Sequence, residues 1–169
     1  KIRTELTSSG ASFVLLLLDD THSYNRNLES FQALYTPVVM DFHQQFINWL
    51  MDDSELGIII KRKKIQNDEW NSPMDLLYNS AKESGRCHLI SDPFGEKASD
   101  YAMVSDFIAT IGPNLSGALI ESVVKDRRGV YYDFPYRRPI KKELYDWGNN
   151  KVIFNNLSKM VESIKLYKN

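Results

Sequence analysis

The amino-acid sequence predicts the α/β fold class, with a doubly wound parallel sheet of about six strands, on three observations. Short apolar runs such as Phe13–Leu18 show no alternation, which is typical of strands buried on both faces. Between these runs, apolar residues recur every three or four positions, as on one face of a helix. The two patterns alternate along the chain, and strands and helices in that order connect through right-handed crossovers into a parallel sheet.

The first half of the chain supplies two strands and a long helix. We expect strands at 13–18 and 56–60, separated by a polar stretch to about residue 33 and by a helix with Thr36 as N-cap and Pro37 as first residue. One face of this helix carries apolar residues at helical spacing, namely Val39, Phe42, Phe46, Trp49 and Leu50.

The second half continues the alternation. A helix begins at Ser72-Pro73 and ends near Gly85, a third strand follows at 88–91, and Ser99 caps a short helix through Val104. The remaining predicted elements are strands at 107–111, 129–132 and 151–154, a helix after a glycine turn at 112–117, a helical turn at 143–147, and a last helix with Leu157, Met160, Val161 and Ile164.

Composition indicates one soluble domain spanning residues 1–169. The chain is 43% hydrophobic, which suffices for a core, and its net charge of −1 provides no positive field for nucleic acid. The longest apolar run is too short for a transmembrane segment. The single cysteine, Cys87, excludes a disulfide framework and indicates a buried thiol in a reducing compartment. Residues 1–10 are polar and lack an initiator Met, and we interpret them as a leader from a longer chain.

The strongest candidate site is the turn 112–117, because it leaves an apolar strand and opens a helix, where ligands bind in such sheets. Helix-terminal N–H groups and the helix dipole favour phosphate there, and Ser116 adds a hydroxyl donor. Glu121 lies one helical turn beyond Gly117, where its carboxylate suits ribose hydroxyls. The plainer alternative is a tight turn in which Ser116 caps the helix and Glu121 is solvated.

A basic segment follows the second strand. Lys61, Arg62 and Lys63 are placed to meet a diphosphate from the opposite side of the crevice. Strand alternation brings one or two of the three inward, and we favour Lys61 and Lys63. The alternative is a solvated basic turn.

An acidic pair, Asp19 and Asp20, follows the first strand and raises the hypothesis of a Mg²⁺-dependent phosphotransfer domain. Such a domain also needs a phospho-accepting aspartate at the end of a later strand, but the later strands end in Lys61 and Ser91. We therefore interpret the pair as turn and cap residues. The three histidines are scattered without carboxylates or cysteine at ligand spacing, so no metal site is expected.

The order of these motifs resembles the C-terminal, nucleotide-sugar-binding half of a GT-B glycosyltransferase of bacterial surface or capsular polysaccharide synthesis. The resemblance covers about residues 54–165. It depends on the strand ending in Ile60-Lys61, on the segments 88–93 and 102–107, and above all on the turn and helix at 112–121. The segments that continue the same order are Gly129–Asp133, Trp147-Gly148 and Val152–Phe154.

The resemblance implies a Rossmann-like domain that binds a nucleoside diphosphate sugar without a metal or cofactor. The implied site residues are Lys61, Lys63, Asn114, Ser116 and Gly117 for the donor diphosphate, Glu121 for the ribose, and Ser91 and Asp92 beside the base. It further implies an N-terminal acceptor-binding domain outside this chain, and a fragment that transfers nothing alone. We expect a cytoplasmic protein, at the periphery of the inner membrane in its full-length form. The rival hypothesis is a non-catalytic α/β ligand-binding or regulatory module that pairs with another protein.

Overall fold

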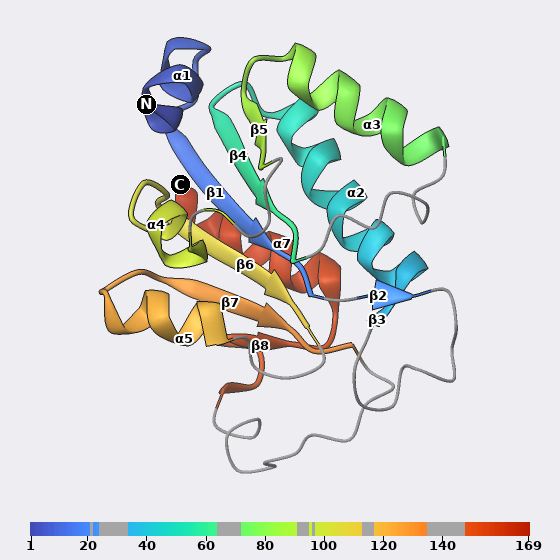
Figure 1. The fold of residues 1–169 in the computed structure, drawn as a ribbon. Helices are drawn as coiled ribbons and strands as arrows, with labels where there is room; N and C mark the ends of the chain where they lie inside the picture. The colour runs from blue at the N-terminus through green and yellow to red at the C-terminus, as the bar shows by residue number, and fades with distance from the viewer. Residues whose placement is uncertain are drawn as a thin grey trace.

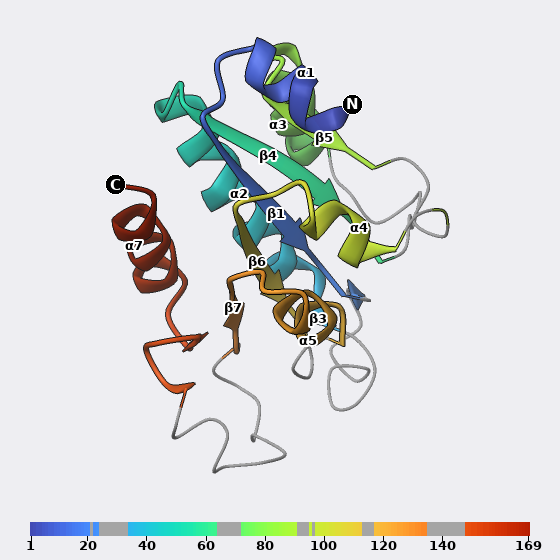
Figure 2. The same cartoon turned by 90° about the vertical axis from the view of Figure 1, so that its left-hand side faces the viewer.

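Six parallel strands form one sheet between two layers of helices (Figures 1 and 2). The computed structural model describes residues 1–20, 22–23, 34–63, 72–90, 95, 97–112, 117–134 and 148–169. The strands of the sheet are β1 (Phe13–Leu18), β4 (Leu56–Lys61), β5 (Cys87–Leu89), β6 (Phe107–Ile111), β7 (Gly129–Tyr132) and β8 (Ile153–Phe154). Their order is β5-β4-β1-β6-β7-β8, which confirms the predicted doubly wound, Rossmann-like sheet.

Helices cover both faces of the sheet. One face packs against α2 (Thr36–Asp52), α3 (Ser72–Glu83) and α7 (Leu157–Lys168), and the other packs against α1 (Ile2–Ser8), α4 (Ala98–Ala102) and α5 (Gly117–Val124). A separate parallel pair is formed by β2 (His22–Ser23) and β3 (Leu34–Tyr35), between β1 and α2 in the chain. The structure therefore has the three layers expected of alternating strands and helices.

The central strand β1 explains why its sequence is apolar without alternation. Leu15 and Leu17 pack into the core under α2, whereas Val14 and Leu16 pack into the core under α1 and α4. All six residues of β1 are buried. Burial of each leucine side chain contributes about 2 kcal/mol to the free energy of folding, so both cores depend on this strand.

The helix α2 confirms the predicted apolar face. Val39, Phe42 and Phe46 are fully buried, and the rings of the two phenylalanines lie 5.0 Å apart between centroids. The predicted N-cap is wrong by one residue, because Tyr35 has the extended backbone of the N-cap and Thr36 is already helical. Pro37 still lies in the first turn, where its missing N–H group leaves no hydrogen bond unmade.

Three further boundaries differ from the predictions. The third strand is Cys87–Leu89 instead of 88–91, since β5 is an edge strand that pairs only with β4. Ser99 is not the cap of α4: the Asp100 carboxylate accepts the Lys97 N–H at 3.1 Å, so the helix begins before Ser99, which is buried within it. The last strand is shorter than 151–154, because a turn occupies residues 148–152. The predicted helical turn at 143–147 lies outside the described residues.

The N-terminal segment forms an element that the sequence analysis did not predict. In α1, Leu6 is only 2% exposed and packs under the sheet. Arg3 pairs with the Asp106 carboxylate at 3.0 Å, and the same carboxylate accepts the Val14 N–H at 2.8 Å. Residues 2–8 are therefore an integral part of the domain.

Two other predictions concern the single cysteine and membrane-spanning segments. Cys87 is buried as predicted, and burial raises the pKa of its thiol to about 12, with Lys82 acting weakly in the opposite direction. Among the described residues, no helix combines the length and apolar character that a membrane crossing requires.

Candidate functional site

The strand order creates a switch point between β1 and β6. The chain leaves β1 toward α2 on one face and leaves β6 toward α5 on the other face, so the two connections diverge. In open α/β sheets, ligands bind beyond the carboxyl ends of the strands at such a point. The predicted glycine turn directly follows β6, and the acidic pair directly follows β1. We call this side of the sheet, where β1, β4 and β6 end, the carboxyl edge.

The described parts of the glycine turn are its two ends. The Gly112 carbonyl accepts a hydrogen bond from the Tyr131 hydroxyl at 2.5 Å, which ties the start of the turn to β7. Gly117 is the first residue of α5, and a Cβ atom at this position would meet no atom within 4 Å. Gly117 is thus exposed, and a side chain at this position would meet no neighbour. Asn114 and Ser116 lie outside the described residues.

Glu121 lies on α5, one turn beyond Gly117, and its side chain is exposed. Ser122 on the same helix is buried and donates to the Ala118 carbonyl at 2.7 Å. Glu121 is therefore on the exposed side of α5, which fits both the predicted ribose-binding carboxylate and the alternative of a solvated acid.

A polar row crosses the carboxyl edge under α4 and α5. In the register of the sheet, Leu18 pairs with Lys61 of β4 and with Thr110 of β6, and Thr110 pairs with Tyr131 of β7. Lys61 is 8% exposed, and its ammonium lies 5.5 Å from the ring centroid of Tyr101. Thr110 is fully buried, and its hydroxyl has no hydrogen-bond partner among the described residues. The backbones of β4 and β6 are two strand spacings apart, about 10 Å, so Lys61 lies within side-chain reach of the switch point.

A buried charge cluster lies on the opposite face of the same edge, under α2 and α3. Its centre is Asp19, whose carboxylate is 1% exposed and lies 3.4 Å from His43 Nε2 and 3.7 Å from Arg62 Nε. The other carboxylate oxygen accepts the Lys63 N–H at 2.7 Å. Because a buried carboxylate needs cations and donors around it, Asp19 joins β1, β4 and α2 at this point.

Tyr78 of α3 packs against His43 at the side of the cluster. Its ring lies 5.9 Å from that of His43 between centroids. Burial raises the pKa of Tyr78 well above its ordinary value, and the Asp19 carboxylate raises it further, while Arg62 acts in the opposite direction. The Tyr78 hydroxyl therefore remains a neutral donor at physiological pH.

Lys63 and Asp20 form the outer part of the edge. The Lys63 side chain is 57% exposed, and its ammonium pairs with the Asp20 carboxylate, whose side chain is 16% exposed. Of the two favoured lysines, Lys61 is thus buried and Lys63 is exposed. Both lie on β4 or directly after it, beside β1 and not beside β6.

The described site residues share the carboxyl edge but lie on opposite sides of β1. Lys61 and Lys63 are at the end of β4, whereas Gly117 and Glu121 follow β6. Ser91 and Asp92, predicted beside the base, lie outside the described residues. The described residues contain no group of three or more histidine, cysteine, aspartate or glutamate side chains that could hold a metal ion.

Sequence reasoning underestimated Asp19, His43 and Arg62, although the signal was available. Asp19 continues the alternation of Leu15 and Leu17, so it points to the α2 face. His43 follows Val39 by four residues on the apolar face of α2. Thus Asp19 is a buried residue that links three elements, and its interpretation as a turn or cap residue is wrong.

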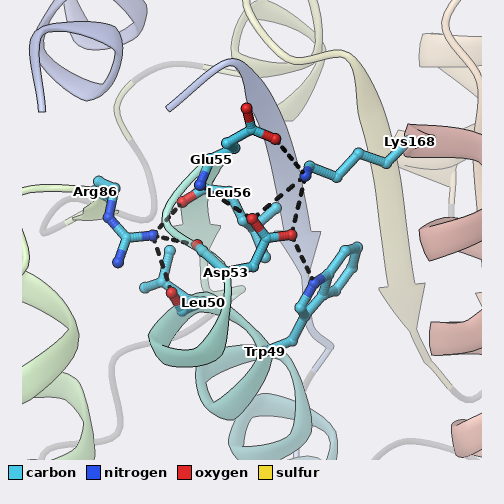
Figure 3. A network of polar contacts seen from close by, with 7 residues as sticks. All are labelled: Trp49, Leu50, Asp53, Glu55, Leu56, Arg86 and Lys168. Atoms are coloured by element: carbon cyan, nitrogen blue, oxygen red, sulfur yellow. Dashed lines mark hydrogen bonds and ion pairs between the residues drawn. The ribbon is translucent and has the colours of Figure 1, made fainter. Parts of the chain in front are cut away.

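The opposite, amino edge of the sheet carries a different network, shown in Figure 3. Arg86 Nη1 donates to the carbonyl oxygens of Leu50, Asp53 and Leu56 at 2.9, 2.6 and 2.9 Å. The Leu50 and Asp53 carbonyls lie at the end of α2, where the last carbonyls lack helical N–H partners, and the Leu56 carbonyl lies at the start of β4. Lys168 pairs with Asp53 at 3.0 Å. This network is structural, because its donors and acceptors satisfy each other.

The fold and the carboxyl edge together define the class: a Rossmann-like α/β domain with an exposed glycine at the start of α5 and a buried charged cluster after β1 and β4. Comparison of the chain with models of protein families, with curated proteins and with solved structures found no match in any of the three.

Proposed function

We propose that this domain binds a nucleoside diphosphate at the carboxyl edge, as the donor half of a glycosyltransferase that uses a nucleotide sugar. The single observation that carries the proposal is the strand order, which puts the glycine turn and the start of α5 at the switch point between β1 and β6. A helix N-terminus at a switch point favours phosphate groups, because its N–H groups and the positive end of its dipole are directed beyond the carboxyl ends of the strands.

The ligand would lie with its diphosphate at the start of α5. Gly117 leaves room for close approach of phosphate oxygens, since no atom lies within 4 Å of its would-be Cβ. Asn114 and Ser116 would donate from the turn, and Glu121 would accept from the ribose hydroxyls. The base would extend toward Ser91 and Asp92.

Charge at the edge supports an anionic ligand. Lys61, Arg62 and Lys63 carry three positive charges at the end of β4, beside the two negative charges of Asp19 and Asp20 at the end of β1. The three cations are consecutive in a chain whose net charge is −1. Lys61 and Lys63 would stabilise the nucleoside diphosphate as the sugar leaves, without a metal ion.

The finer parts of the proposal follow from the resemblance. The domain would work with an acceptor-binding domain in the cytoplasm, and the catalytic base would come from that partner. The rival phosphotransfer hypothesis needs Asp19 and Asp20 as Mg²⁺ ligands. Both carboxylates contact protein cations, Arg62 and Lys63, and this pairing weakens that hypothesis.

Calorimetric titration with UDP, GDP, CDP and ADP tests the proposal. We expect saturable binding of at least one of them, and dissociation constants about tenfold larger for Ser116→Ala and Glu121→Ala, since each loses a hydrogen bond in which one partner is charged. Glu162→Ala is the matched control and should bind like the wild type, because Glu162 lies on the exposed side of α7, which packs on the other face of the sheet. Absence of binding to all four nucleotides would favour the non-catalytic interaction module.

A further inference from the structure

The two aspartates after β1 hold different parts of Lys63. Asp19 accepts the Lys63 main-chain N–H at 2.7 Å, and it is buried with Arg62 and His43 around it. Asp20 instead pairs with the Lys63 ammonium at the surface. The backbone of Lys63 is thus fixed by a buried carboxylate, whereas its charged end is held by a neighbour that solvent reaches.

These two contacts differ in how easily they can be exchanged. A buried carboxylate that accepts a main-chain hydrogen bond is costly to separate from its partners. An ion pair with a largely exposed lysine is weak, because water and salt screen it and the side chain gains freedom when released. The Lys63 ammonium can therefore leave Asp20 for another anion without disturbing the backbone that positions it.

We propose that Asp20 is an internal competitor for the anionic ligand: the Lys63 ammonium exchanges between the Asp20 carboxylate and a ligand phosphate. This inference depends on the proposed function, because it concerns the same edge of the sheet. Asp20 lowers the affinity of the site for all phosphates that use Lys63. Asp20 also makes the site prefer ligands with several negative charges. A diphosphate attracts the Lys63 ammonium more strongly than a singly charged group does, so it competes better with the Asp20 carboxylate.

The exchange predicts that one substitution at the binding site increases the affinity for the ligand. Asp20→Asn removes the competing charge and should tighten binding, whereas loss of a residue with a merely structural role would weaken it. Lys63→Gln should weaken binding, because the exchanging cation is absent. In the double variant Asp20→Asn/Lys63→Gln, the gain from Asp20→Asn should disappear, because the exchange acts through Lys63.

The experiment measures dissociation constants of inorganic pyrophosphate, of the four nucleoside diphosphates and of uridine, for the wild type and these three variants. We expect Asp20→Asn to bind pyrophosphate and the preferred nucleotide about three- to fivefold more tightly, the upper part of the range for an exposed ion pair. Uridine, which carries no phosphate, should show no change. Asp52→Asn, an exposed residue at the other end of α2, changes the net charge equally and should leave all constants unchanged.

The outcomes separate the two claims. Unchanged or weaker binding by Asp20→Asn, or a gain that persists in the double variant, overturns the inference while the nucleotide site stands. Tighter pyrophosphate binding by Asp20→Asn without binding of any nucleoside diphosphate supports the inference and contradicts the proposed ligand. If neither pyrophosphate nor a nucleotide binds to the wild type or to Asp20→Asn, both claims fail. Circular dichroism of each variant confirms that it is folded.

Discussion

The two edges of the sheet both carry charged side chains, but they use them differently. At the amino edge, Arg86 and Lys168 satisfy carbonyl and carboxylate oxygens at the junction of α2 and β4 (Figure 3). At the carboxyl edge, Asp19 and Arg62 are almost fully buried, next to the fully buried His43. Burial of charge costs free energy that simple apolar packing would avoid. The amino edge therefore serves stability, whereas the carboxyl edge holds buried charged side chains beside a switch point.

The largest expected effect is at the buried cluster. Asp19→Ala leaves the Lys63 N–H and the Arg62 guanidinium without this carboxylate, and removal of one partner of a buried pair costs about 3–5 kcal/mol of unfolding free energy. Urea denaturation measures the loss as a lower midpoint at constant slope. Asp19→Asn keeps an acceptor for the Lys63 N–H and should lose less. A loss below about 1 kcal/mol for Asp19→Ala, within the range of exposed ion pairs, would contradict the description of this cluster.

An intermediate effect is expected at the amino edge. Arg86→Ala removes one guanidinium that serves three carbonyl oxygens, and we expect a loss of about 2 kcal/mol, because such bonds share one donor nitrogen and do not add. Arg86→Lys keeps the charge without the planar fork and should recover only part of the loss. The nucleotide dissociation constant of folded Arg86→Ala should equal that of the wild type. A change in that constant would show that the two edges are not separate in function.

The smallest effect is expected at the ion pair of Lys168. Partial burial raises the pKa of Asp53, but the hydrogen bonds from Lys168, the Glu55 N–H and Trp49 outweigh it and hold this pKa below its ordinary value. Lys168→Gln should cost about 1 kcal/mol at pH 7, the upper end for surface ion pairs, since the side chains of Lys168 and Asp53 are only 9% and 23% exposed.

The pH dependence of this pair has a definite sign. Because the Asp53 pKa is lowered in the folded state, its contribution is present above about pH 4 and is lost as the pH falls below that value. Burial lowers the pKa of Lys168, but Asp53 and Glu55 outweigh it and raise this pKa, so the contribution is also lost at strongly alkaline pH. Urea midpoints of the wild type and Lys168→Gln should therefore converge at low pH and in high salt. A difference that grows toward low pH would contradict this assignment.

The fold could be predicted from the sequence because its strong signals are local. The run Phe13–Leu18 and the strands at 107–111 and 129–132 have the predicted bounds, since an apolar run between polar residues has only one way to lie in a sheet that is covered on both faces. The first helix was missed because α1 is short and polar, and its stability comes from distant contacts of Leu6 and Arg3. Such contacts leave no periodic pattern.

The site could be predicted only in part. Its position after β6 followed from the general geometry of α/β sheets. The pairing of Asp19 with His43 and Arg62 could not, because it joins residues 24 and 43 positions apart (43 − 19 and 62 − 19) through tertiary packing. For the same reason, the sequence indicated Lys61 and Lys63 as equivalent cations, but the structure gives them different surroundings. Lys61 lies beside the buried ring of Tyr101, and Lys63 pairs with the partly buried carboxylate of Asp20.

The most direct test of the central claim is a nuclear magnetic resonance titration of the ¹⁵N-labelled chain with the nucleoside diphosphate that binds best by calorimetry. We expect amide shift changes at the carboxyl edge, at Lys63, Gly112 and Gly117, and none at Arg86 or Lys168. Changes centred on the amino edge, or no changes with any nucleotide at saturating concentration, would contradict that claim.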